Sequence, residues 1–177
     1  MSNENFWKDQ YQQSWEKANL RERRIIERIK EETGRDTLTV GLGAGSTEYL
    51  AGSAASRGLE RGGADLHVSG SNIFLEVTGP QTKAVKFDAP LWIRPDKIQN
   101  ARRHYPEHDT WVIHWLEKDG TLRVIQLNQE FFSALDNGEF PIVHPRIRGN
   151  IETYHEISHV HWCVKEWQYL IDHIKQL

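Results

Sequence analysis

The stretch from Gly63 to Gly79, GADLHVSGSNIFLEVTG, constrains the fold of this chain more than any other part of it. Two short segments, Ala64–Val68 and Ile73–Thr78, flank a Ser-Gly-Ser-Asn sequence of the residue types that favour tight turns. Alternate residues of a strand share one face. The second segment therefore has an apolar set predicted to face the core and an opposite set, namely Ile73, Leu75 and Val77 against Phe74, Glu76 and Thr78. The stretch predicts a strand, a turn and a second strand with an acid in its middle.

Glu76 interrupts this apolar run, and an ionised carboxylate is costly to bury without a partner. Asp65, at the start of the neighbouring strand, can bring a second carboxylate close to it. Two converging carboxylates are a minimal site for Mg²⁺, which keeps several waters of its own. Such an ion activates water and stabilises a phosphoryl transition state. In the alternative interpretation, Asp65 caps a turn and Glu76 pairs with a basic residue on the exposed face of the sheet.

The remaining segments predict helices and strands in mixed order. The long first helix ends at Gly34 and carries Glu22 within its apolar stripe, and a later helix has Pro95 in its first turn. The expected elements are a helix over about 5–33, a short strand near 37–40, the two strands above, a linker over 79–92, a helix to 104, strands over 109–116 and 122–127, a short helix over 128–138, an irregular segment over 139–150 and a final helix over about 161–175. This order predicts one mixed α/β domain over residues 1–177, a central mixed sheet flanked by helices, with a C-terminal helical segment over about 128–177.

Composition limits the location of the protein and its ligands. The 177 residues carry a formal net charge of −3, which excludes a polycation but not a local basic face for phosphate groups. Cys163 has no second cysteine to pair with, as expected for a reducing cytoplasm. The first residues lack the pattern of a signal peptide, and no apolar run approaches the roughly 18 residues that span a bilayer. A cytoplasmic protein without membrane contact is expected.

With its two acids, the stretch resembles the core of the PD-(D/E)XK nuclease superfamily. Gly63-Ala64-Asp65 stands where that superfamily has Pro-Asp, and Glu76-Val77-Thr78 stands where it has Glu-x-Lys. The surroundings agree, because a helix with a carboxylate in its apolar stripe precedes the sheet and a helix and strand follow it. The resemblance covers roughly Leu20 to Leu127.

The resemblance implies a restriction-endonuclease-like core and a metal-dependent endonuclease acting on DNA. Asp65 and Glu76 would hold Mg²⁺, for which Mn²⁺ can substitute, and Glu22 would be a third acid on the helix. Thr78 departs from the pattern because it occupies the position of the lysine. Lys97, in the first turn of the next helix, is the preferred replacement, with Lys83 and Lys86 of the linker as alternatives.

Further features extend or compete with this interpretation. Thr78, Arg94 and Ser46 are expected to contact substrate, and nucleases of this fold often pair, which allows a homodimer. Without the usual lysine, the alternative is a nucleic-acid- or protein-binding module that keeps the fold but does not cut. A third interpretation is a sugar-phosphate enzyme using the glycine-rich segment Val40–Thr47. The histidines and cysteine of the segment 154–163, YHEISHVHWC, include zinc-binding residue types, but a satisfied polar segment is favoured.

Overall fold

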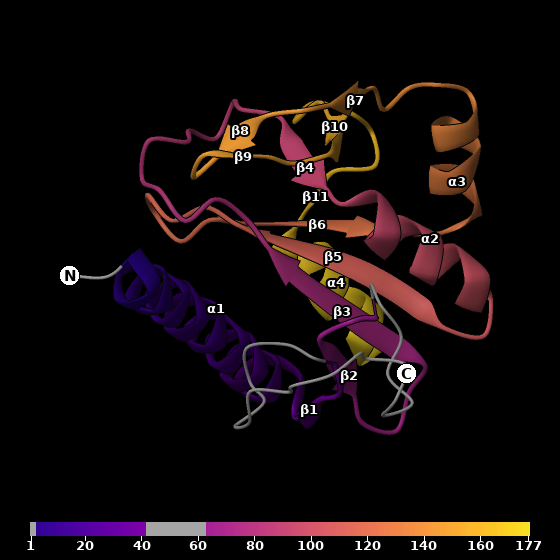
Figure 1. Cartoon of the computed structure of the whole chain (residues 1–177). Helices are drawn as coiled ribbons and strands as arrows, with labels where there is room; N and C mark the ends of the chain where they lie inside the picture. Colours follow the sequence, from indigo (N-terminus) through magenta and orange to yellow (C-terminus); the bar gives the residue numbers. More distant parts are fainter. Residues whose placement is uncertain (1–2, 42–62) are drawn as a thin grey trace.

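The computed structural model describes residues 3–41 and 63–177, and its centre is a six-stranded mixed sheet (Figure 1). The strand order is β1-β2-β3-β5-β6-β11, with bounds Thr37–Thr39, Leu66–Val68, Ile73–Thr78, Asp109–Trp115, Leu122–Gln126 and Lys165–Glu166. Neighbouring strands are antiparallel except β3 and β5, which are parallel. The expected mixed α/β fold with a central mixed sheet is confirmed.

The predicted strand–turn–strand is the hairpin of β2 and β3, in which Leu66 pairs with Leu75. Its turn is closed by Ser71, whose hydroxyl donates to the carbonyl of Val68 at 2.7 Å and accepts from the backbone N–H of Ile73 at 3.0 Å. Gly70, at φ +73°, adopts the left-handed conformation that glycine tolerates best. The turn therefore sets the register that decides which side chains of β3 share a face.

Two hydrophobic cores lie on opposite faces of this sheet. The helices α1 (Asn3–Thr33) and α4 (Trp167–Lys175) cover one face, where the buried side chains include Ile25, Ile29, Leu75, Trp111, Leu170 and Ile171. The helices α2 (Pro95–His104) and α3 (Gln129–Asp136) pack on the other, with Ile98, Val112, Ile125, Phe131 and Phe132. Figure 1 shows α1 and α2 on opposite sides of β3 and β5. Glu76 belongs to the α2 face, because β3 alternates and Leu75 belongs to the α1 face.

The parallel pairing of β3 with β5 places α2 beside the predicted acids. The ladder runs from Ile73 opposite Asp109 to Thr78 opposite His114. Parallel neighbours need a crossover between them, and here the crossover contains α2. The first turn of α2 consequently lies near the end of β3 that carries Glu76.

Several short strands were not expected from the sequence. β4 (Leu91–Ile93) spans the end of the predicted linker and the first residue of the predicted helix. β7 (Ile142–Val143) and β8 (Arg146–Ile147) lie in the segment expected to be irregular, and β9 (Asn150–Ile151) and β10 (Tyr154–Ile157) follow. β4, β10 and β7 form a three-stranded sheet, and β8 pairs with β9. The C-terminal segment is therefore not wholly helical, which corrects the prediction.

The final helix begins at Trp167 and not at His161. Residues 161–164 form a turn, in which the backbone N–H of Val164 donates to the carbonyl of His161 at 3.0 Å. β11 follows and pairs with β6 before the helix starts. Trp162, within the range expected to be helical, is 51 % exposed in this turn.

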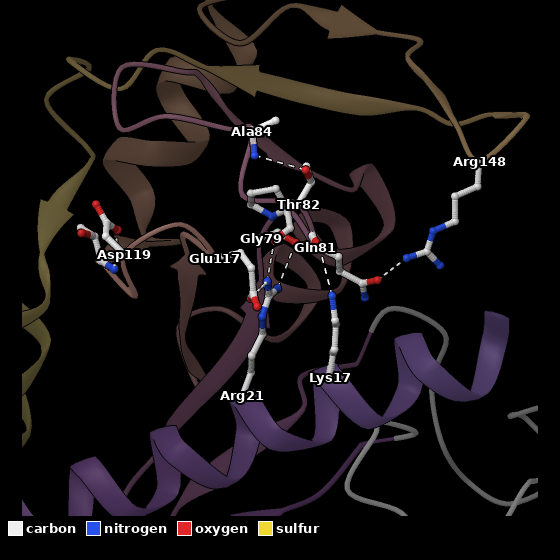
Figure 2. A network of polar contacts seen from close by, with 11 residues as sticks. Lys17, Arg21, Gly79, Gln81, Thr82, Ala84, Glu117, Asp119 and Arg148 are labelled. Carbon is white, nitrogen blue, oxygen red and sulfur yellow. Dashed lines mark hydrogen bonds and ion pairs between the residues drawn. The ribbon is translucent and has the colours of Figure 1, made fainter. Parts of the chain in front are cut away.

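Arg21 of α1 ties that helix to the chain just beyond β3 (Figure 2). Its guanidinium donates to the carbonyl oxygens of Gly79 at 3.1 Å and Pro80 at 2.5 Å, and it pairs with Glu117 at 2.8 Å. Gly79 has φ +140°, and a Cβ there would lie 2.1 Å from the backbone oxygen of Trp115. Only glycine fits this position, so the exit from β3 has a defined path. No helix in the described ranges is both long enough and apolar enough to span a membrane.

Candidate functional site

Asp65 and Glu76 converge on one face of the β2–β3 hairpin. The backbone N–H of Asp65 donates to the carbonyl of Leu75 at 3.0 Å, and its carboxylate accepts from the N–H of Val77 at 3.0 Å. Together with burial, the charge of Asp65 raises the pKa of Glu76, so the two carboxyl groups lie close to each other. Both residues are only 8 % exposed, so the sheet brings two carboxyl groups together out of solvent.

Lys97 completes this cluster from the first turn of α2. Its Nζ lies 2.8 Å from Glu76 Oε2 and 3.9 Å from Asp65 Oδ1, and it donates to the carbonyl of Gly63 at 3.0 Å. Pro95 occupies the N-terminal position of α2, so the turn that carries Lys97 has a defined direction. The prediction that Lys97 points at the two acids is confirmed.

The linker lysines, by contrast, are exposed. Lys83 is close enough to Glu117 for its charge to lower the pKa of that carboxyl group, together with the stronger effect of the Arg21 hydrogen bond. No contact between either Lys83 or Lys86 and the acid pair is present among the hydrogen bonds and ion pairs of the described residues. The choice of Lys97 over both linker residues is thus supported by position.

If both were ionised, the two carboxyl groups would carry more negative charge than one lysine balances. Burial raises the pKa of Glu76 well above its usual range, and the neighbouring Asp65 raises it further, while Lys97 lowers it. Burial likewise raises the pKa of Asp65 against the lowering effect of Lys97. Burial lowers the pKa of Lys97, but the two acids outweigh burial and its pKa is raised. A further positive charge would be stabilised here, which is the electrostatic condition for a divalent cation.

The other predicted site residues are less closely tied to the pair. Glu22 is buried on α1 at 4 % exposure. Within residues 3–41 and 63–177, no three or more His, Cys, Asp or Glu side chains are grouped so as to hold a metal ion, so Glu22 does not form a third ligand with the pair. Arg94 is exposed and pairs with Asp96 at 2.5 Å, yet its charge lowers the pKa of both Asp65 and Glu76. Ser46 and most of the glycine-rich segment lie outside the described residues.

Thr78 continues the same face, and beside it the structure reveals two buried polar residues that the sequence analysis missed. His114 pairs with Thr78 across the parallel ladder, and Arg123 pairs with His114 on β6. Arg123 donates to His114 Nδ1 at 3.2 Å and to the carbonyl of Phe87 at 3.0 Å. Burial, with the charges of Arg123 and Arg21, lowers the pKa of His114 to about 3, so its ring is neutral. Alternate residues of a strand share a face, and this rule, applied to β5 and β6, is the signal that could have placed His114 and Arg123 on this face.

The histidine-rich segment divides among separate partners. His161 contacts Cys163 Sγ at 3.1 Å and Glu139 at 3.0 Å, whereas His155 contacts the carbonyl of Phe140 at 2.9 Å and His159 lies edge-on to Phe87. Burial raises the pKa of Cys163 to about 12, which keeps it a neutral thiol. These contacts agree with a satisfied polar segment.

Trp92, next to Arg94, is engaged within the protein. Its Nε1 donates to Glu156 at 2.9 Å, and its ring stacks on Tyr154. Trp92 lies on β4, and both of its partners lie on β10, so it packs within the small sheet.

Neither a family model nor a curated protein matches this chain. Among solved structures, it is similar to a nuclease from a fusselovirus, at 15 % identity over 84 % of this chain and 81 % of the other, with a TM-score of 0.44. A likeness of this size carries no argument about what the chain does.

Proposed function

We propose that this protein is a metal-dependent nuclease that hydrolyses DNA phosphodiester bonds. The observation that carries the proposal is the convergence of Asp65, Glu76 and Lys97, two acids and a lysine, on one face of the sheet. The lysine comes from α2 and not from the position of Thr78, but its ammonium reaches the same carboxylates. The charge of the cluster supports the binding of a cation.

The arrangement of elements also supports the proposal. A helix with a buried carboxylate, Glu22, precedes an antiparallel set β1-β2-β3, and α2 then leads to β5 beside β3. This is the order that the resemblance to the PD-(D/E)XK superfamily implies around its two acids. Glu76 lies on β3 and Asp65 directly precedes β2, as that resemblance requires.

In this proposal Asp65 and Glu76 would hold Mg²⁺, which would supply activation of water and charge compensation for the phosphate. Lys97 has to turn from Glu76, because its ammonium now lies at 2.8 Å from the carboxylate that would bind the ion. Its freed ammonium can donate to the attacking water or to a phosphate oxygen. The hydrogen bond from the backbone N–H of Val77 would keep the carboxylate of Asp65 oriented towards the ion.

The test is cleavage of plasmid, single-stranded and branched DNA, and of RNA, with Mg²⁺ or Mn²⁺ and with chelator. Glu76→Gln should abolish cutting because it removes a metal ligand without changing shape, and Glu130→Gln, an exposed residue of α3, is the matched control. Lys97→Ala should slow cutting by roughly two to four orders of magnitude, and Glu22→Gln should have a smaller effect. If no substrate is cut and Glu76→Gln leaves thermal stability in Mg²⁺ unchanged, the acids are structural.

The second candidate is a binding module that keeps the fold and does not cut. Thr78 in the place of the usual lysine favours it, as does the ion pair between Lys97 and Glu76. It predicts DNA binding that is the same with Mg²⁺ and with chelator. A homodimer and a cytoplasmic location stay predictions, which sedimentation and fractionation would test.

A further inference from the structure

Four aromatic rings form a continuous stack beside the candidate site. The ring centroids are 4.5 Å apart for His67 and Phe74, 4.2 Å for Phe74 and His108, and 4.7 Å for His108 and His104, and the planes of neighbouring rings differ by 20° or less. His67 belongs to β2, Phe74 to β3, His104 to the end of α2 and His108 to the loop that follows. All four side chains are half-buried, so the row is partly open to solvent.

This ring stack, His67-Phe74-His108-His104, continues the face that carries the acids. His67 follows Asp65 by two residues and Phe74 precedes Glu76 by two. Residues two apart on a strand share a face and lie about 7 Å apart. The stack therefore begins within the length of about one nucleotide from the two carboxylates.

Hydrogen bonds fix the stack in this arrangement. His67 Nε2 contacts the carbonyl of Ser71 at 2.8 Å, which orients the first ring. Asn72 donates to the carbonyl of Glu107 at 3.2 Å and accepts at its own carbonyl from the N–H of Asp109 at 2.8 Å. These bonds hold the loop of His108 against the hairpin turn, so little ordering is needed when a ligand binds.

The ring stack differs from the two hydrophobic cores in its burial and in its residue types. The aromatic side chains Trp111, Phe131 and Phe132 are fully buried in the two hydrophobic cores. The ring stack is instead three imidazoles and one phenyl ring, half-buried and next to charged groups. Half-buried aromatic rings next to charged groups can stack with another planar ring that carries polar atoms at its edge.

We propose that this stack binds the unpaired bases of single-stranded DNA next to the candidate cleavage site. A base in a duplex is stacked on its neighbours, and its faces are not available to a protein. An unpaired base can extend the row of rings, and such stacking contributes about 1–3 kcal/mol per base. The inference deepens the proposed function, on which it rests, by naming DNA with a single-stranded segment as the substrate.

The test measures binding in chelator, so that cleavage plays no part. Fluorescence anisotropy compares a labelled single strand with the duplex of the same sequence, and 2-aminopurine in the strand reports stacking through loss of its emission. Wild-type protein should prefer the single strand and quench 2-aminopurine. Phe74 lies between His67 and His108, so Phe74→Leu interrupts the row that supports the end ring on which a base stacks. The variant should weaken single-strand binding about 5- to 150-fold, the range that corresponds to one stacked base, and leave duplex binding within about twofold.

Two further variants complete the design. Tyr169→Leu is the control, because Tyr169 is an exposed aromatic residue on α4, at the opposite face of the sheet, and should change nothing. His104→Ala removes the end of the stack without touching a strand, and should reproduce the effect if Phe74→Leu does not fold. Equal loss for single strand and duplex, no loss in either, or unquenched 2-aminopurine overturns the inference.

These outcomes are separate from those of the proposed function. If single strands bind through the stack and no divalent ion supports cutting, the nuclease proposal fails and the binding inference stands. If DNA is cut but Phe74→Leu binds single strands as tightly as the wild type, the inference alone fails. Absence of any nucleic-acid binding contradicts both.

Discussion

Replacing Lys97 with methionine tests the electrostatics of the candidate site without any assumption about its substrate. Methionine preserves most of the stem and removes the ammonium that lies 2.8 Å from Glu76 and 3.9 Å from Asp65. The two acids would then face each other with Arg94 as the remaining cation that affects both of them. Breaking a buried ion pair by removing one partner costs about 3–5 kcal/mol.

That cost should depend on pH, because Glu76 can bind a proton in place of its lost partner. Glu76 has a raised pKa in the folded wild type, so the wild type loses stability as pH rises from the unfolded pKa towards the folded one and then levels off. Removing Lys97 raises the folded pKa further, so the variant goes on losing stability where the wild type has levelled. The difference should grow by up to about 1.4 kcal/mol per pH unit in that interval. The charge of Lys97 in the wild type stays constant over that pH interval, because its raised pKa keeps the ammonium protonated until alkaline pH.

Urea unfolding in chelator between pH 5 and pH 9 measures the difference. The expected result is a small destabilisation at acidic pH that approaches the full cost of the broken pair at alkaline pH. Lys83→Met, at an exposed linker position, is the control and should change stability by less than about 0.5 kcal/mol at every pH. A destabilisation by Lys97→Met that is the same at every pH would refute the inference that Glu76 binds a proton in place of its lost partner.

Three further substitutions test how the site is supported, each by urea unfolding. Gly79→Ala should cost about 2–4 kcal/mol, since it combines a φ of +140° with a backbone clash, whereas Gly120→Ala, at φ +70° with open space, should cost about 1 kcal/mol; equal costs would contradict this. Arg21→Met should cost about 2–4 kcal/mol and return the lowered pKa of Glu117 towards its usual value, as an NMR titration would show; an unchanged pKa would exclude the pairing. Asn128→Ala should cost about 1 kcal/mol by removing the cap of α3, and a neutral change would show that the cap is replaced by solvent.

The sequence was sufficient for the hairpin and the acids because both depend on local rules. The turn residues and the alternation around Glu76 decide which side chains share a face, and neither depends on distant parts of the chain. Lys97 could be chosen because Pro95 marks the start of its helix. Its contact with Glu76 further requires that α2 crosses from β3 to β5, which the expected order of elements already contained.

The parts that the sequence did not predict depend on contacts between distant segments. β7, β8 and β9 have two residues each, too few to show a period of two. β11 exists because it pairs with β6, and this pairing delays the start of α4 to Trp167. In the sequence, Arg123 is a single polar residue in an apolar strand. Its burial depends on His114 and on the linker, which surround its side chain in the folded protein.

The parallel register between β3 and β5 has a consequence for how the protein matures during synthesis. All three residues of the candidate site lie before residue 100, but α2 is held in place by packing that includes Val112 of β5 and Ile125 of β6. Pairing between strands so far apart in sequence is formed late, because a long loop must close first. A nascent chain released only as far as Asp109 would contain Asp65, Glu76 and Lys97 and still lack the cluster, so any activity would be withheld until the centre of the sheet had been made.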